Sequence, residues 1–218
     1  MASQLEISPR YNTENLTEAQ FQSGSNRRVL KNLLGIKRKR EMDALEAVKL
    51  SEATDWAIRN YSVDYRFTAQ DIDGLHQQWL GTVYPWAGKH RQVNISKGGF
   101  TFAMAAQVSR LMAEFERDVL AKYTPCNFNN RDDVIEALAI THCELVLIHP
   151  YREGNGRTSR LLATLMALQA GLPLLDFSGI TGKAKQAYFF AVQASMNGDY
   201  APMKAVFNAV LKKTERRI

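Results

Sequence analysis

Residues 149–160 read HPYREGNGRTSR and combine four kinds of chemistry within a short stretch of chain. His149 can act as a base, because a neutral imidazole accepts a proton from a hydroxyl group near physiological pH. Glu153 supplies a carboxylate, a glycine-rich turn leaves the backbone bare, and two arginines follow at a spacing of three. This combination is typical of a site that activates a nucleophile beside a bound anion.

The glycine turn indicates what that anion is. Gly154, Asn155 and Gly156 precede a run with helical periodicity, so backbone amides and the positive end of the helix dipole should converge on one point. Arg157 and Arg160 should lie near one face of the first helical turn. Two positive charges near the positive end of the helix dipole are unfavourable unless a bound anion offsets them, which favours a phosphate ligand. The sequence lacks the Walker pattern that ends in Gly-Lys-Ser/Thr.

The position of His149 separates it from the other histidines. Pro150 disfavours helical geometry in the residue before it, so we expect the imidazole at a helix-to-loop junction. Loop residues on a rigid scaffold are often functional. The remaining three histidines are interpreted as structural: His76, His90 and His142.

Two roles are open for Glu153. It can hold Mg²⁺, which prefers one or two carboxylates together with phosphate oxygens and water. Alternatively, Glu153 forms an ion pair with a nearby arginine such as Arg152.

The elements that position these residues are mainly helical. Apolar residues recur at helical spacing through most of the chain, which predicts an all-α fold. Thr68, Asn130 and Asp199 are typical helix N-caps. The predicted helices cover about 42–56, 69–79, 108–119, 131–148, 155–170, 183–196 and 200–213.

A single segment, about 91–102, has the alternation of a β-hairpin. Val93 and Ile95 alternate with polar residues, Lys97–Gly99 supplies the turn, and Phe100 and Phe102 alternate on the return. We therefore expect an isolated hairpin flap on a helical body. Its free edge can accept an extended peptide, although a purely structural clip is an equal alternative.

Size and composition favour one domain. The chain has 218 residues and no composition break, so we expect a polar extension over 1–30 and a single domain over 31–213. The two cysteines fit neither a disulfide framework nor a metal site, which favours a reducing cytoplasm. No apolar run approaches the roughly 20 residues that cross a bilayer, and no export signal is recognised.

The formal charge of +6 raises the question of nucleic-acid binding. The basic run Lys37–Arg40 is accompanied by no RNP motif, zinc-finger spacing or basic stripe with interleaved aromatic residues. A positive surface equally suits a nucleoside triphosphate or an acidic protein. Nucleic acid is therefore not the expected partner.

Residues 149–160 closely resemble the signature of the Fic family, HPFx[D/E]GNGRxxR, and depart from it only at Tyr151. The segment TVYPWAGKHRQVNISKGGFTFA resembles the stretch that leads into the family's flap, and MNGDYAPM resembles its late helix junction. The resemblance covers roughly residues 30–210. It implies a helical fold with one β-hairpin flap, in agreement with the periodicity.

The resemblance also implies an activity, namely transfer of AMP from ATP to a hydroxyl group of a target protein. It makes His149 the general base, Glu153 the magnesium ligand, and Arg157 with Arg160 the triphosphate clamp. Gly154, Asn155 and Gly156 would cradle the phosphates. The implied target-binding flap residues are Ile95, Ser96, Lys97, Gly98, Gly99, Phe100 and Thr101, and Tyr188 is a weaker candidate for adenine contact.

Other members of the family carry an inhibitory motif, [S/T]xxxE[G/N], whose glutamate pairs with the first motif arginine, here Arg157. This sequence contains no match to that motif. We therefore expect a bacterial toxin controlled by a small helical antitoxin that supplies the glutamate. A degenerate inhibitory helix within 1–30 or 205–218 is the competing hypothesis.

Three other functions are open. A branch resembling Doc phosphorylates its target, but it departs from the Gly-Asn-Gly found here. Some relatives transfer other nucleotides or phosphocholine. The third possibility is a nucleotide-binding regulator without catalytic activity.

Overall fold

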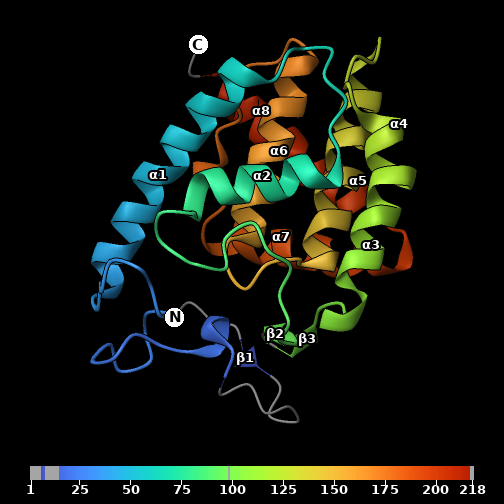
Figure 1. Ribbon diagram of the computed structural model, residues 1–218. Helices are drawn as coiled ribbons and strands as arrows, with labels where there is room; N and C mark the ends of the chain where they lie inside the picture. Colours follow the sequence, from blue (N-terminus) through green and yellow to red (C-terminus); the bar gives the residue numbers. More distant parts are fainter. Residues whose placement is uncertain (1–5, 8–14, 98, 217–218) are drawn as a thin grey trace. The chain divides into compact units, whose positions relative to one another are not determined.

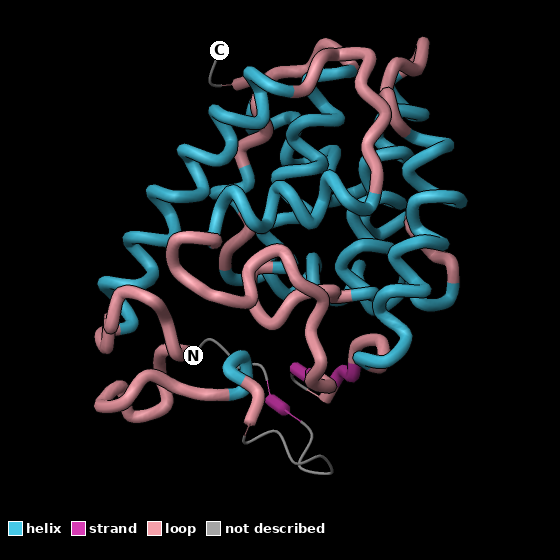
Figure 2. Tube along the Cα trace, viewed as in Figure 1, coloured by secondary structure: helices cyan, strands magenta, loops and turns pink. Residues whose placement is uncertain are grey.

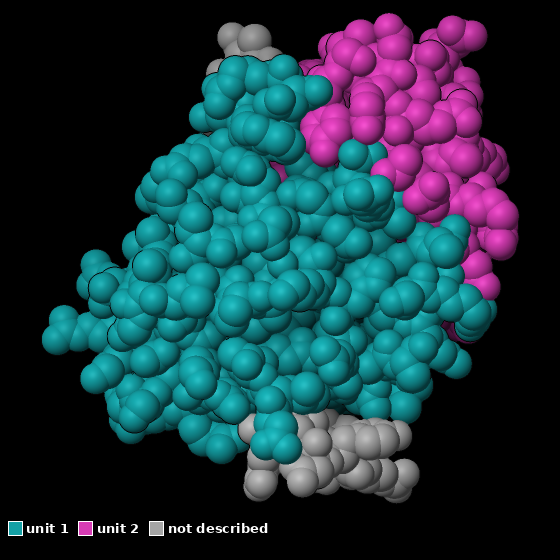
Figure 3. Space-filling model, in the orientation of Figure 1, with its two compact units in different colours: residues 1–60, 69–113, 148–155 teal, residues 61–68, 114–147, 156–218 magenta. Residues whose placement is uncertain are grey.

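The computed structural model describes residues 6–7, 15–97 and 99–216 (Figure 1). The chain divides into two compact units, each assembled from three segments (Figure 3). Unit 1 comprises residues 1–60, 69–113 and 148–155, and unit 2 comprises residues 61–68, 114–147 and 156–218. This division differs from the expected single run over 31–213, because the chain passes repeatedly from one unit to the other.

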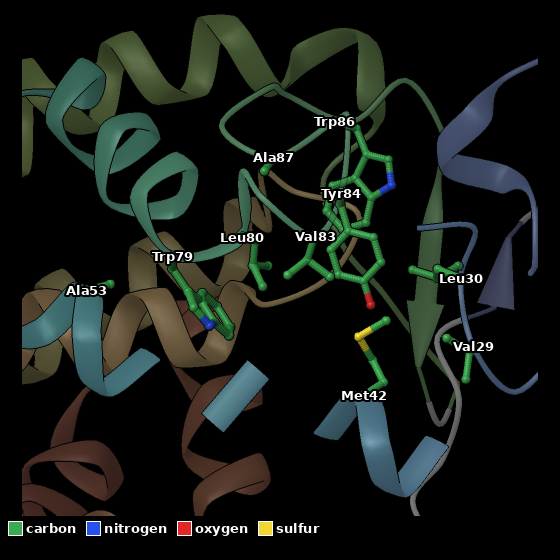
Figure 4. Packing of buried hydrophobic residues seen from close by; sticks show 10 residues of the cluster. All are labelled: Val29, Leu30, Met42, Ala53, Trp79, Leu80, Val83, Tyr84, Trp86 and Ala87. Carbon is green, nitrogen blue, oxygen red and sulfur yellow. The ribbon is translucent and has the colours of Figure 1, made fainter. Parts of the chain in front are cut away.

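Unit 1 contains two packed helices, α1 (Lys39–Asn60) and α2 (Ala69–Leu80), as the periodicity predicted (Figure 1). Their contact buries an apolar cluster around Trp79 and Leu80 (Figure 4). Trp79 Nε1 donates to the Glu46 carbonyl at 2.9 Å, and the Tyr84 hydroxyl donates to the Glu46 carboxylate at 2.8 Å. The polar atoms of Trp79 and Tyr84 in this cluster are thus hydrogen-bonded, whereas the buried Nε1 of Trp86 has no hydrogen-bond partner among the described residues.

The predicted polar extension is not separate from this core. Val29 and Leu30 belong to the same cluster and are 2% and 8% exposed (Figure 4). A short 3-10 turn, η1 (Thr17–Ala19), also buries Glu18 in unit 1. The extension therefore ends earlier than residue 30, because burial of its last apolar residues is favourable.

The flap is a three-stranded antiparallel sheet in the order β1-β2-β3 (Figure 2). The predicted hairpin is present as β2 (Ile95–Lys97) and β3 (Phe100–Thr101), whereas Gly98 lies outside the described residues. The expected free edge of β2 is instead paired with β1 (Glu6–Ile7), through Ile7 with Ile95 and Glu6 with Ser96. Two residues are too few to show strand alternation, so the sequence did not reveal β1.

Most of the longer helices of unit 2 also match their predictions. Helix α5 (Arg131–Ile148) begins after Asn130, whose side chain accepts from the Asp133 amide at 2.8 Å. Helix α6 (Asn155–Gln169) follows the glycine turn, and its first residue belongs to unit 1. Helices α7 (Gly182–Ala194) and α8 (Ala201–Glu215) pack against each other (Figure 1).

The helix predicted over 108–119 is interrupted. It consists of α3 (Val108–Phe115), a π-helical turn η3 (Glu116–Leu120) and α4 (Ala121–Tyr123). The remaining short 3-10 turns are η2 (Ala105–Gln107), η4 (Phe177–Gly179) and η5 (Ser195–Asn197). Within the described part of the chain, no helix has the length and apolar character that a membrane span requires.

Candidate active site

His149 lies at the predicted helix-to-loop junction. Helix α5 ends at Ile148, and His149 follows with a φ of 54°, in the left-handed region. A non-glycine residue pays roughly 1 kcal/mol or more for this conformation, so surrounding contacts must hold it there. The imidazole is stacked on Phe102, with ring centroids 3.6 Å apart and an interplanar angle of 20°. The residue is 7% exposed.

The loop after His149 is closed by one side chain. Asn155 Oδ1 accepts from the Tyr151 amide at 2.8 Å, and Asn155 Nδ2 donates to the Tyr151 carbonyl at 2.7 Å. The side chain predicted to cradle phosphate therefore shapes the loop. Its backbone amide opens α6, where amides favour an anion.

Tyr151, the departure from the family motif, is fully buried, and its hydroxyl has a partner. The hydroxyl donates to Asp73 Oδ1 at 2.7 Å, and the ring stacks on His76 with centroids 3.8 Å apart. His76 Nδ1 accepts from the Gly88 amide at 2.8 Å, so the proton is on Nε2, 3.0 Å from the Glu153 carbonyl. His76 is thus a structural residue, as expected, and it holds the loop through its contacts with Tyr151 and Glu153.

Gly154 is required by close packing. Its φ is 89°, and a Cβ atom at this position would lie 2.7 Å from Cζ3 of Trp79. The glycine therefore meets both a conformational and a steric demand, and it lets the chain turn directly into α6.

Glu153 is half-buried, and its Oε1 accepts from the Gly154 amide at 3.0 Å. Its negative charge also acts on Arg152. Burial lowers the pKa of Arg152, and the negative charges of Glu153 and then Glu18 oppose that decrease. Arg152 Nε donates to the Glu18 carbonyl at 3.0 Å. The two interpretations of Glu153 are compatible, because the electrostatic interaction with Arg152 does not prevent the carboxylate from binding a cation.

Whether the site suits magnesium can be judged from its donors. Across the described ranges there is no group of three or more His, Cys, Asp or Glu side chains that could hold a metal on its own. Mg²⁺ usually binds through one or two carboxylates while substrate phosphates and water complete its shell. A single half-buried carboxylate beside a helix N-terminus fits this second kind of site.

The unit 2 portion of the motif begins at Gly156. Arg157 and Arg160 lie on the first turns of α6 and are half-buried. A Cβ atom on Gly156 would lie 3.6 Å from Arg160 Nη1 and 3.9 Å from the Tyr188 hydroxyl. Gly156 therefore keeps one face of the helix bare beside the Arg160 guanidinium.

Tyr188 is 7% exposed, and its hydroxyl lies 2.8 Å from Nε2 of His142. Burial raises the pKa of Tyr188 to about 12. Burial, followed by the charge of Arg160, lowers the pKa of His142 to about 3, so this imidazole is neutral at physiological pH. The arrangement favours a structural role for Tyr188, next to Arg160, over adenine contact. No pattern in the sequence predicts the contact between Tyr188 and His142, which lie 46 residues apart.

The flap residues differ in accessibility. Ile95 is fully buried and anchors the sheet, whereas Ser96, Lys97 and Phe100 are half-buried. Gly99 and Thr101 are exposed. The predicted target-binding role thus falls on the accessible backbone and side chains, with Ile95 as their support.

These features define a mainly helical protein in which a helix-terminal histidine precedes a glycine turn and an arginine-bearing helix. The family model described as the Fic/DOC family matches residues 66–167, which include the whole of the motif over 149–160.

Curated relatives agree in name. The chain is 29% identical over 182 residues to the probable protein adenylyltransferase y4lH of Sinorhizobium fredii, covering 81% of this chain and 88% of the relative. It is 29% identical over 143 residues to the protein adenylyltransferase VbhT of Bartonella schoenbuchensis and 30% identical over 152 residues to the protein adenylyltransferase Fic of Drosophila melanogaster. Those matches cover 66% and 67% of this chain but 30% and 28% of the relatives, so the chain spans less than a third of either.

Solved structures share the fold. The N-terminal Fic domain of a Bartonella effector protein from Bartonella sp. AR 15-3 superposes with a TM-score of 0.74 at 22% identity, covering 95% of this chain and 97% of that one. A Fic domain from Bartonella quintana with bound ADP gives a TM-score of 0.71 at 25% identity, covering 89% and 95%. The described helices and flap therefore share the fold of these Fic domains.

Proposed function

We propose that this chain is a protein adenylyltransferase that transfers AMP from ATP to a hydroxyl side chain of a target protein. The observation that carries the proposal is the sequence of parts along residues 149–160. A histidine in a strained left-handed conformation follows the last residue of α5. The next loop is closed by hydrogen bonds between Asn155 and Tyr151, and a glycine turn then leads into a helix with two arginines. The names of the relatives support the same activity.

In this reaction, His149 takes the proton of the target hydroxyl while the oxygen attacks the α-phosphorus of ATP. A new oxygen–phosphorus bond forms, the bond between the α-phosphorus and the bridging oxygen breaks, and pyrophosphate leaves with the bond's electrons. Amides at the start of α6 and the guanidinium groups of Arg157 and Arg160 offset the negative charge of the phosphates.

Glu153 is the residue that would hold Mg²⁺ in this proposal. When bound, the metal supplies positive charge to the phosphate oxygens. The fit rests on the position of a half-buried carboxylate directly before α6. The same carboxylate also accepts from the Gly154 amide, which fixes its position next to the turn.

Labelled nucleotides test the activity. With ATP labelled at the α-phosphate and a lysate as the source of targets, we expect the added chain to put label on protein, whereas with ATP labelled at the γ-phosphate it should add none above the lysate alone. His149→Ala should abolish labelling and leave the Kd for ATP within about twofold, because it removes the base and no phosphate ligand. Arg157→Ala should instead weaken ATP binding.

The outcomes separate the alternatives. Transfer of the γ-label would identify a Doc-like kinase, and ATP binding without transfer of either label would identify a regulator. Equal transfer by the wild type and His149→Ala would exclude the assigned base.

We also propose control in trans, in a bacterial cytoplasm, by a small helical antitoxin that presents a glutamate to Arg157. Within α8, Glu215 is engaged by Arg131 at 2.6 Å, which supports the view that this helix is not the inhibitor. In residues 15–30 the described structure has a 3-10 turn and no α-helix. The purified chain alone should then be active with ATP and Mg²⁺. Activity that appears only after deletion of residues 1–14, or in Glu215→Gln, would show internal inhibition.

A further inference from the structure

Arg91 is a buried cation of unit 1 whose guanidinium bonds to several backbone carbonyls. Its guanidinium donates to four backbone carbonyls: His149 at 2.7 Å, Val93 at 2.7 Å, Ala103 at 2.5 Å and Ile148 at 3.3 Å. The Arg91 amide also donates to the Pro150 carbonyl at 2.8 Å. The residue is 2% exposed, so these bonds replace its hydration.

The four carbonyls belong to two structures that the proposed reaction must align. Val93 and Ala103 stand just before and just after the flap strands β2 and β3. Ile148 and His149 form the end of α5 and the position of the general base. One planar guanidinium therefore connects the two ends of the flap, at Val93 and Ala103, to the backbone of His149, the proposed general base.

A second contact runs parallel to the first. Phe102, which follows β3, stacks on the His149 imidazole, and its amide donates to the Ile95 carbonyl at 3.2 Å. A shift of the flap roots would therefore move the ring that packs against the base. One of the carbonyls that accept from Arg91 belongs to His149 itself, whose φ is 54°. This strained conformation persists only when its surroundings enforce it.

The chemistry of the contact requires arginine. Several donors in a fixed fork can reach several carbonyls together, whereas a lysine ammonium is a compact charge on a flexible stem. Burial lowers the pKa of Arg91 to about 10, and Glu18 opposes that shift, so the group is charged at neutral pH. Glu18 itself accepts from the Gln92 amide at 2.7 Å, directly next to Arg91.

We propose that Arg91 is a positioning residue that couples the flap to the general base, so that docking of the target and orientation of His149 are one event. The proposal rests on the proposed adenylyl transfer for its kinetic consequences. Its structural consequences, a fixed flap and a fixed imidazole, hold without any substrate.

The test compares Arg91→Lys and Arg91→Met with Met42→Ala, a cavity variant in the unit 1 core far from the flap in sequence. Met42 is 1% exposed and does not belong to the site, so its truncation lowers stability by a different route. Three quantities are measured in each protein: the melting temperature, amide exchange of Phe102 without ligand, and the NMR titration of the His149 imidazole. The kcat and KM for target labelling and the Kd for ATP are measured in parallel.

For Arg91→Met we expect at least tenfold faster exchange at Phe102, a changed His149 titration, and a kcat reduced about 10- to 100-fold with the Kd for ATP nearly unchanged. Arg91→Lys should restore a small part of these losses, since it keeps the charge but not the fork. Met42→Ala should lower the melting temperature and leave the other quantities near wild type.

Equal changes at Phe102 and His149 in Met42→Ala would overturn the proposal, because they would follow from lost stability alone. Normal exchange and a normal His149 titration in both Arg91 variants would overturn it as well. If the wild type transfers no label, the proposed activity fails, yet the exchange and titration measurements still decide whether Arg91 couples flap and base.

Discussion

The hydroxyl of Tyr151 donates to Oδ1 of Asp73 at 2.7 Å, which links the loop after His149 to α2. His90 Nε2 lies 3.3 Å from the same carboxylate oxygen. Burial and the negative charge of Asp73 raise the pKa of Tyr151 well above its ordinary value, so the hydroxyl remains a donor at all physiological pH values. The residue that departs from the family motif thus adds a bond and leaves the aromatic anchor in place.

Tyr151→Phe should therefore be mild. The phenylalanine keeps the stack on His76 and loses one hydrogen bond, whose removal costs about 1 kcal/mol of folding free energy. Asp73 stays partly exposed, so water can replace the lost donor. Chemical denaturation and AMP transfer measure both effects. A loss of transfer greater than about tenfold would mean that the hydroxyl does more than anchor the loop.

Gly154→Ala should be severe. The substitution places a Cβ atom 2.7 Å from the Trp79 ring at a φ of 89°, so it adds a clash to the strain of a left-handed residue. We expect a loss of about 2 to 4 kcal/mol in unfolding free energy. Gly171→Ala is the matched control, because its φ is 71° and no atom lies within 4 Å of the added carbon. Similar losses in the two variants would show that strain alone matters.

His142 should make stability depend on pH. Its pKa is about 3 in the folded chain and 6.5 ordinarily, so between these values the unfolded chain binds a proton that the folded chain does not. The contribution of His142 is favourable above pH 6.5, and stability falls by up to about 1.4 kcal/mol per pH unit as the pH decreases toward 3. His142→Gln should flatten this part of the profile. Denaturant titrations between pH 4 and 8 measure the difference, and parallel profiles would contradict the assignment.

Strand β1 should compete with an extended target at the β2 edge. Ser96 is paired with Glu6 on one side and with Thr101 on the other. Ile7→Pro disturbs only the β1 pairing and should lower the KM for the target, whereas Ser96→Pro disturbs the flap itself and should impair modification. Neither change should alter the Kd for ATP. An unchanged KM in Ile7→Pro would indicate that targets do not use the edge that β1 covers.

Tyr188→Phe distinguishes positioning from adenine contact. The variant keeps the ring and removes the hydroxyl that lies 2.8 Å from His142. If Tyr188 is structural, unfolding free energy should fall by about 1 to 3 kcal/mol, because His142 Nε2 would be left without this bond in the core. The preference for ATP over GTP should not change. A reduced preference would restore the adenine role.

The sequence by itself determined the helices, the hairpin and the local plan of the site. Apolar spacing within a helix, alternation in a strand and the effect of Pro150 on His149 act over a few residues, so a short stretch of sequence contains all the information needed. The same locality explains why α6 was predicted to begin at the glycine turn and why the interpretation of residues 149–160 needed no distant contact.

Only the tertiary structure decided which polar groups serve that plan. In the sequence Arg91 is indistinguishable from an ordinary surface charge beside Lys89 and His90. In the structure it is buried, and it donates to carbonyls that lie up to 58 residues away. The pairing of β1 with β2 and the contact of Tyr188 with His142 likewise join distant segments. A buried polar group takes whatever partner the fold brings within hydrogen-bonding distance, and that partner is set by packing of the whole unit.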